Sequence, residues 1–167
     1  LHAVRLADNR AGRTAASAVA LVEIAVPLLG HAALAPGLCA WYLLVFGLEW
    51  TLYPEMLLCV LLYGAIGTST QFALKWILTA HAFAPAASMT TMLLGSSTGL
   101  FTTVDDVWPA ALPLLYANPL FYVLQYALRV SDDDFDADLE QWQCFVGVAA
   151  YVVAAALVGW AAQRWRR

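Results

Sequence analysis

Long apolar runs separated by short polar segments are the dominant pattern of this chain. Four of the runs are long enough for the ~20 residues that a transmembrane helix needs. They occupy residues 14–48, 51–75, 86–104 and 141–163. We interpret the first run as one kinked span with a broken outer section, because it contains Pro27 and an Ala-Pro-Gly step. The pattern predicts an all-α, polytopic membrane helical bundle that forms a single domain over 1–167.

A fifth apolar segment, 108–129, differs from the others because it contains three prolines. Its Asn118-Pro119 step should interrupt any helix near the middle. Arginines cluster at both ends of the chain, and such clusters mark the cytoplasmic side of a membrane. An even number of crossings, four, puts both termini on that side. We therefore interpret 108–129 as a re-entrant element that dips in from the outer face, and 130–140 as an acidic outer loop.

The composition supports a membrane protein and argues against a soluble helical bundle. Of 167 residues, 62% are hydrophobic and 12% are charged, against roughly 25% charged residues in a soluble domain. The net charge of -4 comes from the acidic loop and gives no indication of a nucleic-acid partner. We expect a multi-pass protein of the plasma membrane or of an organelle membrane. Because the chain starts at Leu1 without a signal-peptide pattern, we also expect it to be a piece of a longer protein.

Motifs for catalysis, nucleotide binding and metal binding are absent from the sequence. It contains no G-x-x-x-x-G-K-[ST], no H-E-x-x-H, no G-x-S-x-G and no paired-cysteine zinc pattern. The acidic run DDDFDADLE could surround calcium, but it lacks the central glycine and distal glutamate of a calcium loop, so a solvated loop is favoured. Cys39, Cys59 and Cys144 have no metal-type spacing and are expected to be inert buried thiols. No catalytic residue and no metal ligand is predicted.

Two polar residues, Glu23 and His31, lie within the first predicted span. A carboxylate is costly in lipid, so Glu23 should face the interior of the bundle, near the cytoplasmic end of its helix. It could be a relay or a substrate contact, or a hydrogen-bonding anchor between helices, and we favour the anchor. His31 could titrate near neutral pH, or bond a neighbouring helix. Lys75, at the far end of the second span, is placed to reach the interface, and a turn over 81–85 should follow it.

The third span carries glycines and hydroxyls that a purely lipid-facing helix does not need. Gly95 and Gly99 form a small-xxx-small pattern, which lets two helices approach closely. At helical spacing Ser88, Met92 and Gly95 share one face with Gly99, and threonines lie beside them. Such a face can be a packing seam between helices or the wall of a cavity that tolerates polar groups.

The order of motifs along the chain is more specific than any one of them. An arginine-bearing segment with a glycine (VRLADNRAGRTAAS) precedes a helix with a glutamate and a proline (LVEIAVPL). The segments VFGLEW, STGLF, VWPAALPLL and ANPLFY then follow in that order. Over nearly its whole length the chain resembles the C-terminal half of the membrane domain of G-subfamily ABC transporters, the white and pleiotropic-drug-resistance type exporters.

The resemblance implies roles for particular residues. Residues 1–13 would form a cytoplasmic coupling loop that contacts an ATP-binding domain, with Arg5, Arg10 and Gly12 in it. The central substrate cavity, at a dimer interface, would be lined by Ser88, Thr91, Met92 and Gly95. Leu100 and Phe101 would form the extracellular gate. The expected partners are the ATP-binding domain, a second transmembrane half and the bilayer. ATP and Mg are expected on the nucleotide-binding domain, and no cofactor is expected in this chain.

We therefore expect the membrane-spanning part of an ATP-driven ABC exporter, which is not itself an enzyme. The competing expectation is a structural membrane subunit of a larger complex, with no transport pathway of its own. A water-accessible face on 86–104 would favour transport, and a dry seam would favour the structural subunit.

Overall fold

The computed structural model describes the backbone of residues 2–99, 109–131 and 139–166, and the side chains of 17–79, 81–90, 92, 109–110, 112–130 and 139–166. All secondary structure in these residues is helical. The elements are α1 (His2–Phe46), η1 (Trp50–Leu52), α2 (Tyr53–Ile77), α3 (Ala80–Gly99), η3 (Pro109–Ala111), α4 (Leu112–Ala117), α5 (Pro119–Ser131) and α6 (Gln141–Arg166). The all-α fold class is confirmed.

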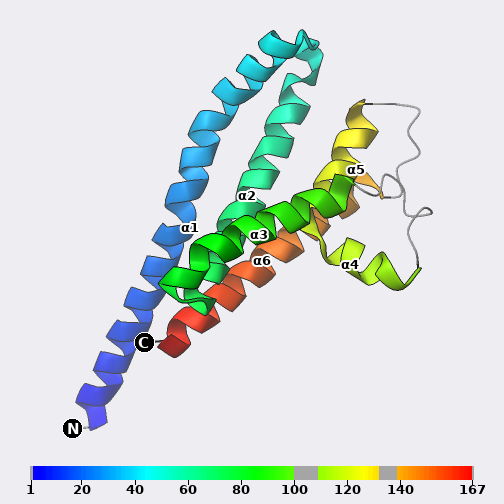
Figure 1. Ribbon diagram of the computed structural model, residues 1–167. Helices are drawn as coiled ribbons and strands as arrows, with labels where there is room; N and C mark the ends of the chain where they lie inside the picture. Colours follow the sequence, from blue (N-terminus) through cyan, green and yellow to red (C-terminus); the bar gives the residue numbers. More distant parts are fainter. Residues whose placement is uncertain (1, 100–108, 132–138, 167) are drawn as a thin grey trace.

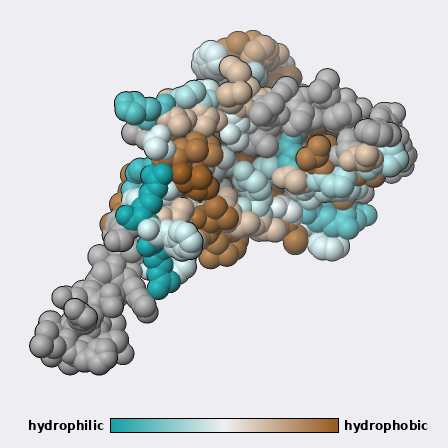
Figure 2. All heavy atoms as spheres, turned by 60° about the horizontal axis from the view of Figure 1, so that its bottom comes forward, coloured by the Kyte–Doolittle hydropathy of each residue, from teal (hydrophilic) through white to brown (hydrophobic). Residues whose placement is uncertain are grey.

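Three of the helices are long and apolar enough to cross a membrane, at Ser17–Phe46, Trp50–Ile77 and Gln141–Arg166. These segments indicate an integral membrane protein and agree closely with three of the four predicted spans. The fourth prediction, 86–104, overlaps α3, which is not among these three, and its last residues lie outside the described part of the chain. Apolar side chains occupy the middle of the face in Figure 2, with hydrophilic side chains on either side.

Helix α2 is the central element, since it packs against α1, α3, α5 and α6, and most extensively against α6 (Figure 1). Small residues allow α2 and α6 to approach each other closely. A Cβ atom at Gly159 of α6 would lie only 2.5 Å from the ring of Phe72 on α2. Between the same helices the hydroxyls of Thr70 and Tyr151 share a hydrogen bond of 2.9 Å. Dispersion contacts and interhelical hydrogen bonds of this kind drive helix association in lipid.

Helix α1 is continuous over 45 residues, which corrects two predictions. No break occurs at 35–37, and residues 2–13, predicted as a loop, have helical backbone. Each internal proline removes one backbone hydrogen bond and crowds the carbonyl four residues earlier, but the alanines and leucines around it favour a helix. At 1.5 Å per residue α1 is ~68 Å long, about twice the thickness of the hydrocarbon core. Its N-terminal part projects beyond the other helices (Figure 1).

Helix α1 ends at Phe46, and Gly47, the next residue, has a left-handed backbone with φ of 63°. The amide of Leu48 donates to the carbonyl of Leu43 over 3.0 Å. This is the Schellman pattern, in which a left-handed residue after the helix lets the chain turn back and satisfies a terminal carbonyl. The turn brings η1 and α2 back along α1.

The turn between α2 and α3 lies at Leu78 and Thr79, so the prediction of a turn over 81–85 is wrong. The Thr79 carbonyl accepts from the amides of Ala82 and Phe83, both at 3.0 Å, and the first turn of α3 therefore begins there. Pro85 is accommodated inside the helix, where the surrounding alanines keep helix propensity high. The Arg166 guanidinium donates to the carbonyls of Ile77 and Leu78, at 2.9 and 3.0 Å, which ties the end of α6 to this turn.

The predicted break at Asn118-Pro119 is confirmed. Helix α4 ends at Ala117 and α5 begins at Pro119. The buried Asn118 caps α5, because its Oδ1 accepts from the Leu120 amide over 3.0 Å. Helix α5 then packs against α2 and α6. A Cβ at Gly147 of α6 would lie 2.5 Å from the ring of Tyr122 on α5.

Candidate functional site

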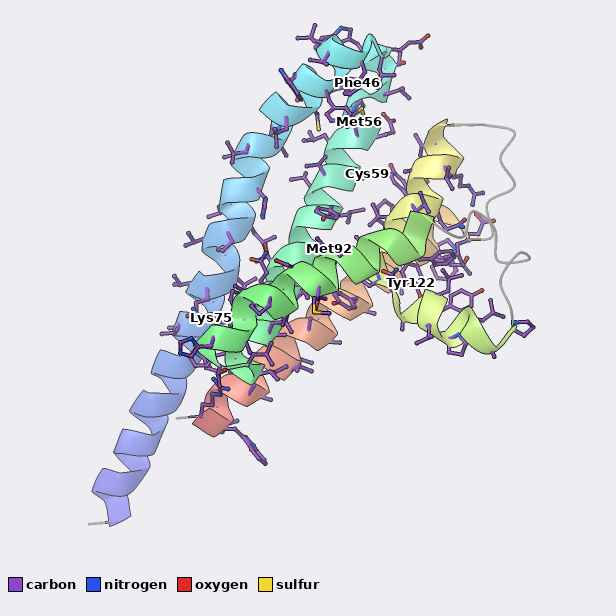
Figure 3. The ribbon with its side chains drawn as sticks, viewed as in Figure 1. Phe46, Met56, Cys59, Lys75, Met92 and Tyr122 are labelled. Atoms are coloured by element: carbon purple, nitrogen blue, oxygen red, sulfur yellow. The ribbon has the colours of Figure 1, made fainter. Side chains whose placement is uncertain are left out.

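A charged cluster joins α1 to α2 near the end of the bundle where both termini lie (Figures 1 and 3). Lys75 donates to Oε1 of Glu23 over 2.7 Å, and the indole of Trp76 donates to Oε2 over 2.8 Å. The Glu23 side chain is 23% exposed and that of Lys75 is 53% exposed. Both carboxylate oxygens therefore have a donor from α2, which is what an anchor between the helices requires.

The cluster lies at one end of the apolar length of the helices rather than at its middle. At 1.5 Å per residue about 35 Å of helix separates Glu23 from Phe46, and about 33 Å separates Lys75 from Tyr53. Both lengths match a hydrocarbon core of about 30 Å plus a short margin. Glu23 and Lys75 can thus pair at the interface, where the cost of a charge is much lower than at the bilayer centre.

A cavity of about 390 Å³ lies beside this cluster, between α1, α2 and α3. Its polar lining consists of Glu23 on α1 and Thr68, Gln71 and Lys75 on α2. Its apolar lining comes from Val22, Val26, Pro27, Phe72 and Phe83. The cavity can hold a small amphipathic molecule, but the carboxylate that would bind it already has two donors.

His31 has a packing contact with α2 in the structure. A Cβ at Gly64 of α2 would lie 3.2 Å from Cβ and Cγ of His31. The imidazole is otherwise exposed on α1. This places His31 about two helical turns from Glu23 at 3.6 residues per turn, so the two predicted polar residues do not form one site.

The face of α3 that sequence analysis singled out points away from the rest of the described chain. Ala87 and Thr90 line a small space of about 30 Å³ against α2 and α5. Ser88 is exposed, and Met92 is 73% exposed. The helix therefore has one face packed on α2, whereas Ser88 and Met92, on another face, are exposed to a large extent.

The other predicted site residues lie partly or wholly outside the described region. The side chain of Thr91 and the exposure of Gly95 are not described, and Leu100 and Phe101 fall in the gap after α3. Arg5, Arg10 and Gly12 belong to the helical backbone at the start of α1. The structure thus brings together only the α3 positions 88 and 92 of the predicted cavity set.

Comparison of the chain with protein-family models, with curated proteins and with solved structures finds no match.

The described residues hold no cluster of three metal-ligating side chains, and the acidic run at 132–138 lies outside them. At the edge of that run Arg129 pairs with Glu140 at 3.1 Å and donates to the Leu139 carbonyl at 2.9 Å. The three cysteines are free, with Cys39 and Cys144 buried.

Sequence analysis missed the partners of Glu23. A signal was present, because Glu23 and Lys75 were both expected near the cytoplasmic side of adjacent spans, and opposite charges at one depth are candidates to pair. Trp76 carried no such signal, since a tryptophan beside a lysine at a helix end is typical of any interfacial belt. The hydrogen bond between Thr70 and Tyr151 depends on how α2 and α6 face each other, which sequence does not give.

Proposed function

We propose that the chain is the membrane-spanning part of an ATP-driven exporter of the G-subfamily ABC type. In this proposal the exposed face of α3 lines the substrate pathway where the chain meets a second transmembrane half. The observation that carries the proposal is the orientation of α3. Its face with Ser88 and Met92 is exposed, whereas Ala87 and Thr90 pack toward α2. A helix with a serine hydroxyl and a flexible methionine on an exposed face suits a pathway for varied apolar molecules.

The proposed topology has four crossings, by α1, α2, α3 and α6, with both termini in the cytoplasm. These helices run alternately away from and back toward the end of the bundle where both termini lie (Figure 1). At 1.5 Å per residue the 20 residues of α3 give ~30 Å, the thickness of the hydrocarbon core. Helices α4 and α5 form the re-entrant element, and α5 is covered by α2 and α6. Irregular backbone at membrane depth requires such cover.

The proposed partner on the cytoplasmic side is an ATP-binding domain, which would also hold ATP and Mg. The first turns of α1, with Arg5, Arg10 and Gly12, would contact it. Support comes from the length of α1, whose N-terminal part projects beyond the bundle (Figure 1). A rigid helix that extends from the bilayer into the cytoplasm can transmit a movement of that domain to the membrane helices. The gate at Leu100 and Phe101 follows α3 directly in the sequence.

The test is transport by the intact protein with the pathway narrowed. Ser88→Trp with Met92→Trp adds two bulky side chains to the exposed face of α3. Efflux of a panel of lipophilic fluorescent dyes should fall for large dyes and persist for small ones. Val153→Trp is the matched control, because Val153 is 57% exposed on α6 and the proposal places it in lipid. If the double variant inserts normally and exports all dyes at the normal rate, the pathway does not run along α3. If the unaltered protein exports none of the dyes, the structural-subunit alternative stands.

A further inference from the structure

The N-terminal end of α2 carries an acidic side chain that the exporter proposal does not use. Glu55 lies in the first turn of α2 and lines a groove of about 360 Å³ between α2 and α5. The other lining residues come from the α1–α2 turn, from α2 and from α5. They are Leu48, Leu52, Met56, Cys59, Val60, Ala127, Leu128 and Val130. Glu55 is the only charged residue among them. Met56 and Cys59 lie near the same end of α2 as this turn (Figure 3).

The carboxylate of Glu55 differs from those of Glu23 and Glu49, whose side chains the structure also describes. Its Oε2 is buried and has no hydrogen-bond partner among the described residues. In Glu23, by contrast, both oxygens accept hydrogen bonds from α2. Glu49, in the α1–α2 turn, is exposed and accepts from Thr51 at 3.3 Å.

The helix dipole favours acidic residues in a first turn, so it accounts for an acid at this position. It does not account for an oxygen that is shielded from water inside an apolar groove without a donor. A buried polar atom of this kind raises the free energy of the folded state until a partner is supplied. Among the described residues, therefore, no positively charged group or hydrogen-bond donor is paired with Oε2 of Glu55.

We propose that this groove binds a lipophilic organic cation, with the apolar body against α2 and α5 and the positive group on Glu55. Its volume lies within the 300–1,000 Å³ typical of small-molecule sites. A metal ion suits it poorly, because hard cations need several oxygen ligands and only one carboxylate lines the groove. About 30 Å of helix separates Glu55 from Lys75 at 1.5 Å per residue. The site is thus near the opposite membrane boundary, where amphipathic cations gather.

The binding test uses the intact protein in nanodiscs, without ATP. The probes are a fluorescent decyl-trimethylammonium conjugate and its neutral analogue, in which carbon replaces the quaternary nitrogen. The cation should bind saturably, and at least about tenfold more tightly than the neutral analogue, since loss of one partner of a desolvated charge pair costs well over 1.4 kcal/mol. Glu55→Gln should weaken binding of the cation by a similar factor and leave the neutral analogue unchanged. Glu49→Gln, at the exposed acid of the same turn, should change neither.

Three results would overturn the proposal. One is equal affinity of the unaltered protein for the two probes. Another is a loss of affinity for the cation in Glu49→Gln as large as that in Glu55→Gln. This result would mean that the negatively charged surface attracts the cation without a specific site. The third is unchanged binding of the cation in Ala127→Trp. This variant fills the groove from α5 and keeps the Glu55 carboxylate, so unchanged binding would place the site elsewhere. This last variant also decides the question if Glu55→Gln fails to fold. Because the assay needs no transport, its outcome is separate from that of the exporter proposal.

Discussion

The contact between α2 and α6 at Gly159 makes a quantitative prediction about stability. In Gly159→Ala the new Cβ would lie 2.5 and 2.6 Å from Cδ1 and Cε1 of Phe72 and 3.0 Å from the Cα of Ala73. The first neighbour is a ring that is only 3% exposed, and the second is backbone, so neither can move without disturbing the interface. Overpacking of this kind costs about 1–3 kcal/mol. Gly67→Ala in α2 is the matched control, because a Cβ there meets nothing within 4 Å.

Both substitutions remove a helical glycine, so the gain in helix propensity, about 1 kcal/mol, is common to the two variants. Their difference should therefore isolate the steric cost. For a chain of this size 1 kcal/mol corresponds to about 2–4 °C in Tm, so Gly159→Ala should melt about 2–12 °C below Gly67→Ala. A dye that fluoresces on reaction with thiols can follow the transition in detergent, since Cys39 and Cys144 are each 1% exposed. Equal Tm values for the two variants would refute the close packing of α2 on α6.

Three further predictions concern the charged residues. Glu23→Gln should lower the Tm by a few degrees, because the ion pair and one charge-assisted hydrogen bond between α1 and α2 are lost. An unchanged Tm would mean that the cluster does not anchor these helices. A charged thiol reagent added from outside should label a cysteine at Asp134 and miss one at Arg166, and labelling of the latter would contradict the proposed topology. Reversing the charge of Arg5 and Arg10 together should uncouple ATP hydrolysis from transport while the protein still inserts, so unchanged substrate-stimulated hydrolysis would count against the proposed coupling role.

The sequence predicted the elements whose signals are local. The second and fourth spans were placed to within a few residues of α2 and α6, because apolar runs of sufficient length end there at polar or charged residues. The break at Asn118-Pro119 followed from the missing proline amide and the restricted residue before it. In both cases the deciding residues lie within one segment.

Where the prediction failed, proline was given too much weight. Pro36 and Pro85 were taken as signs of a break and of a turn, yet both lie inside helices. One missing hydrogen bond does not end a helix whose neighbours have high helix propensity. The real ends depend on Gly47, with its left-handed backbone, and on Thr79, whose carbonyl opens α3.

The candidate sites show the same division between local and tertiary information. Helical periodicity placed Ser88 and Met92 on one face, and the structure has both exposed. Which face of α3 would be covered by α2 depended on the packing of three helices, and periodicity alone left it open. The groove at Glu55 was not foreseen, because it exists only where α5 comes to lie beside α2. The role of the α3 face stays a prediction.

Water access to Met92 tests the central claim most directly. The measurement is the rate at which a charged, membrane-impermeant thiol reagent labels Met92→Cys in proteoliposomes, in a protein whose three native cysteines are replaced. A thiol in lipid or in a dry seam does not react, because the thiolate forms only in contact with water. If α3 lines a pathway, Met92→Cys should react readily, while Val153→Cys on α6 should not. If Met92→Cys is as unreactive as Val153→Cys, the exposed face of α3 is covered by lipid or by a fixed partner, and the transport account is contradicted.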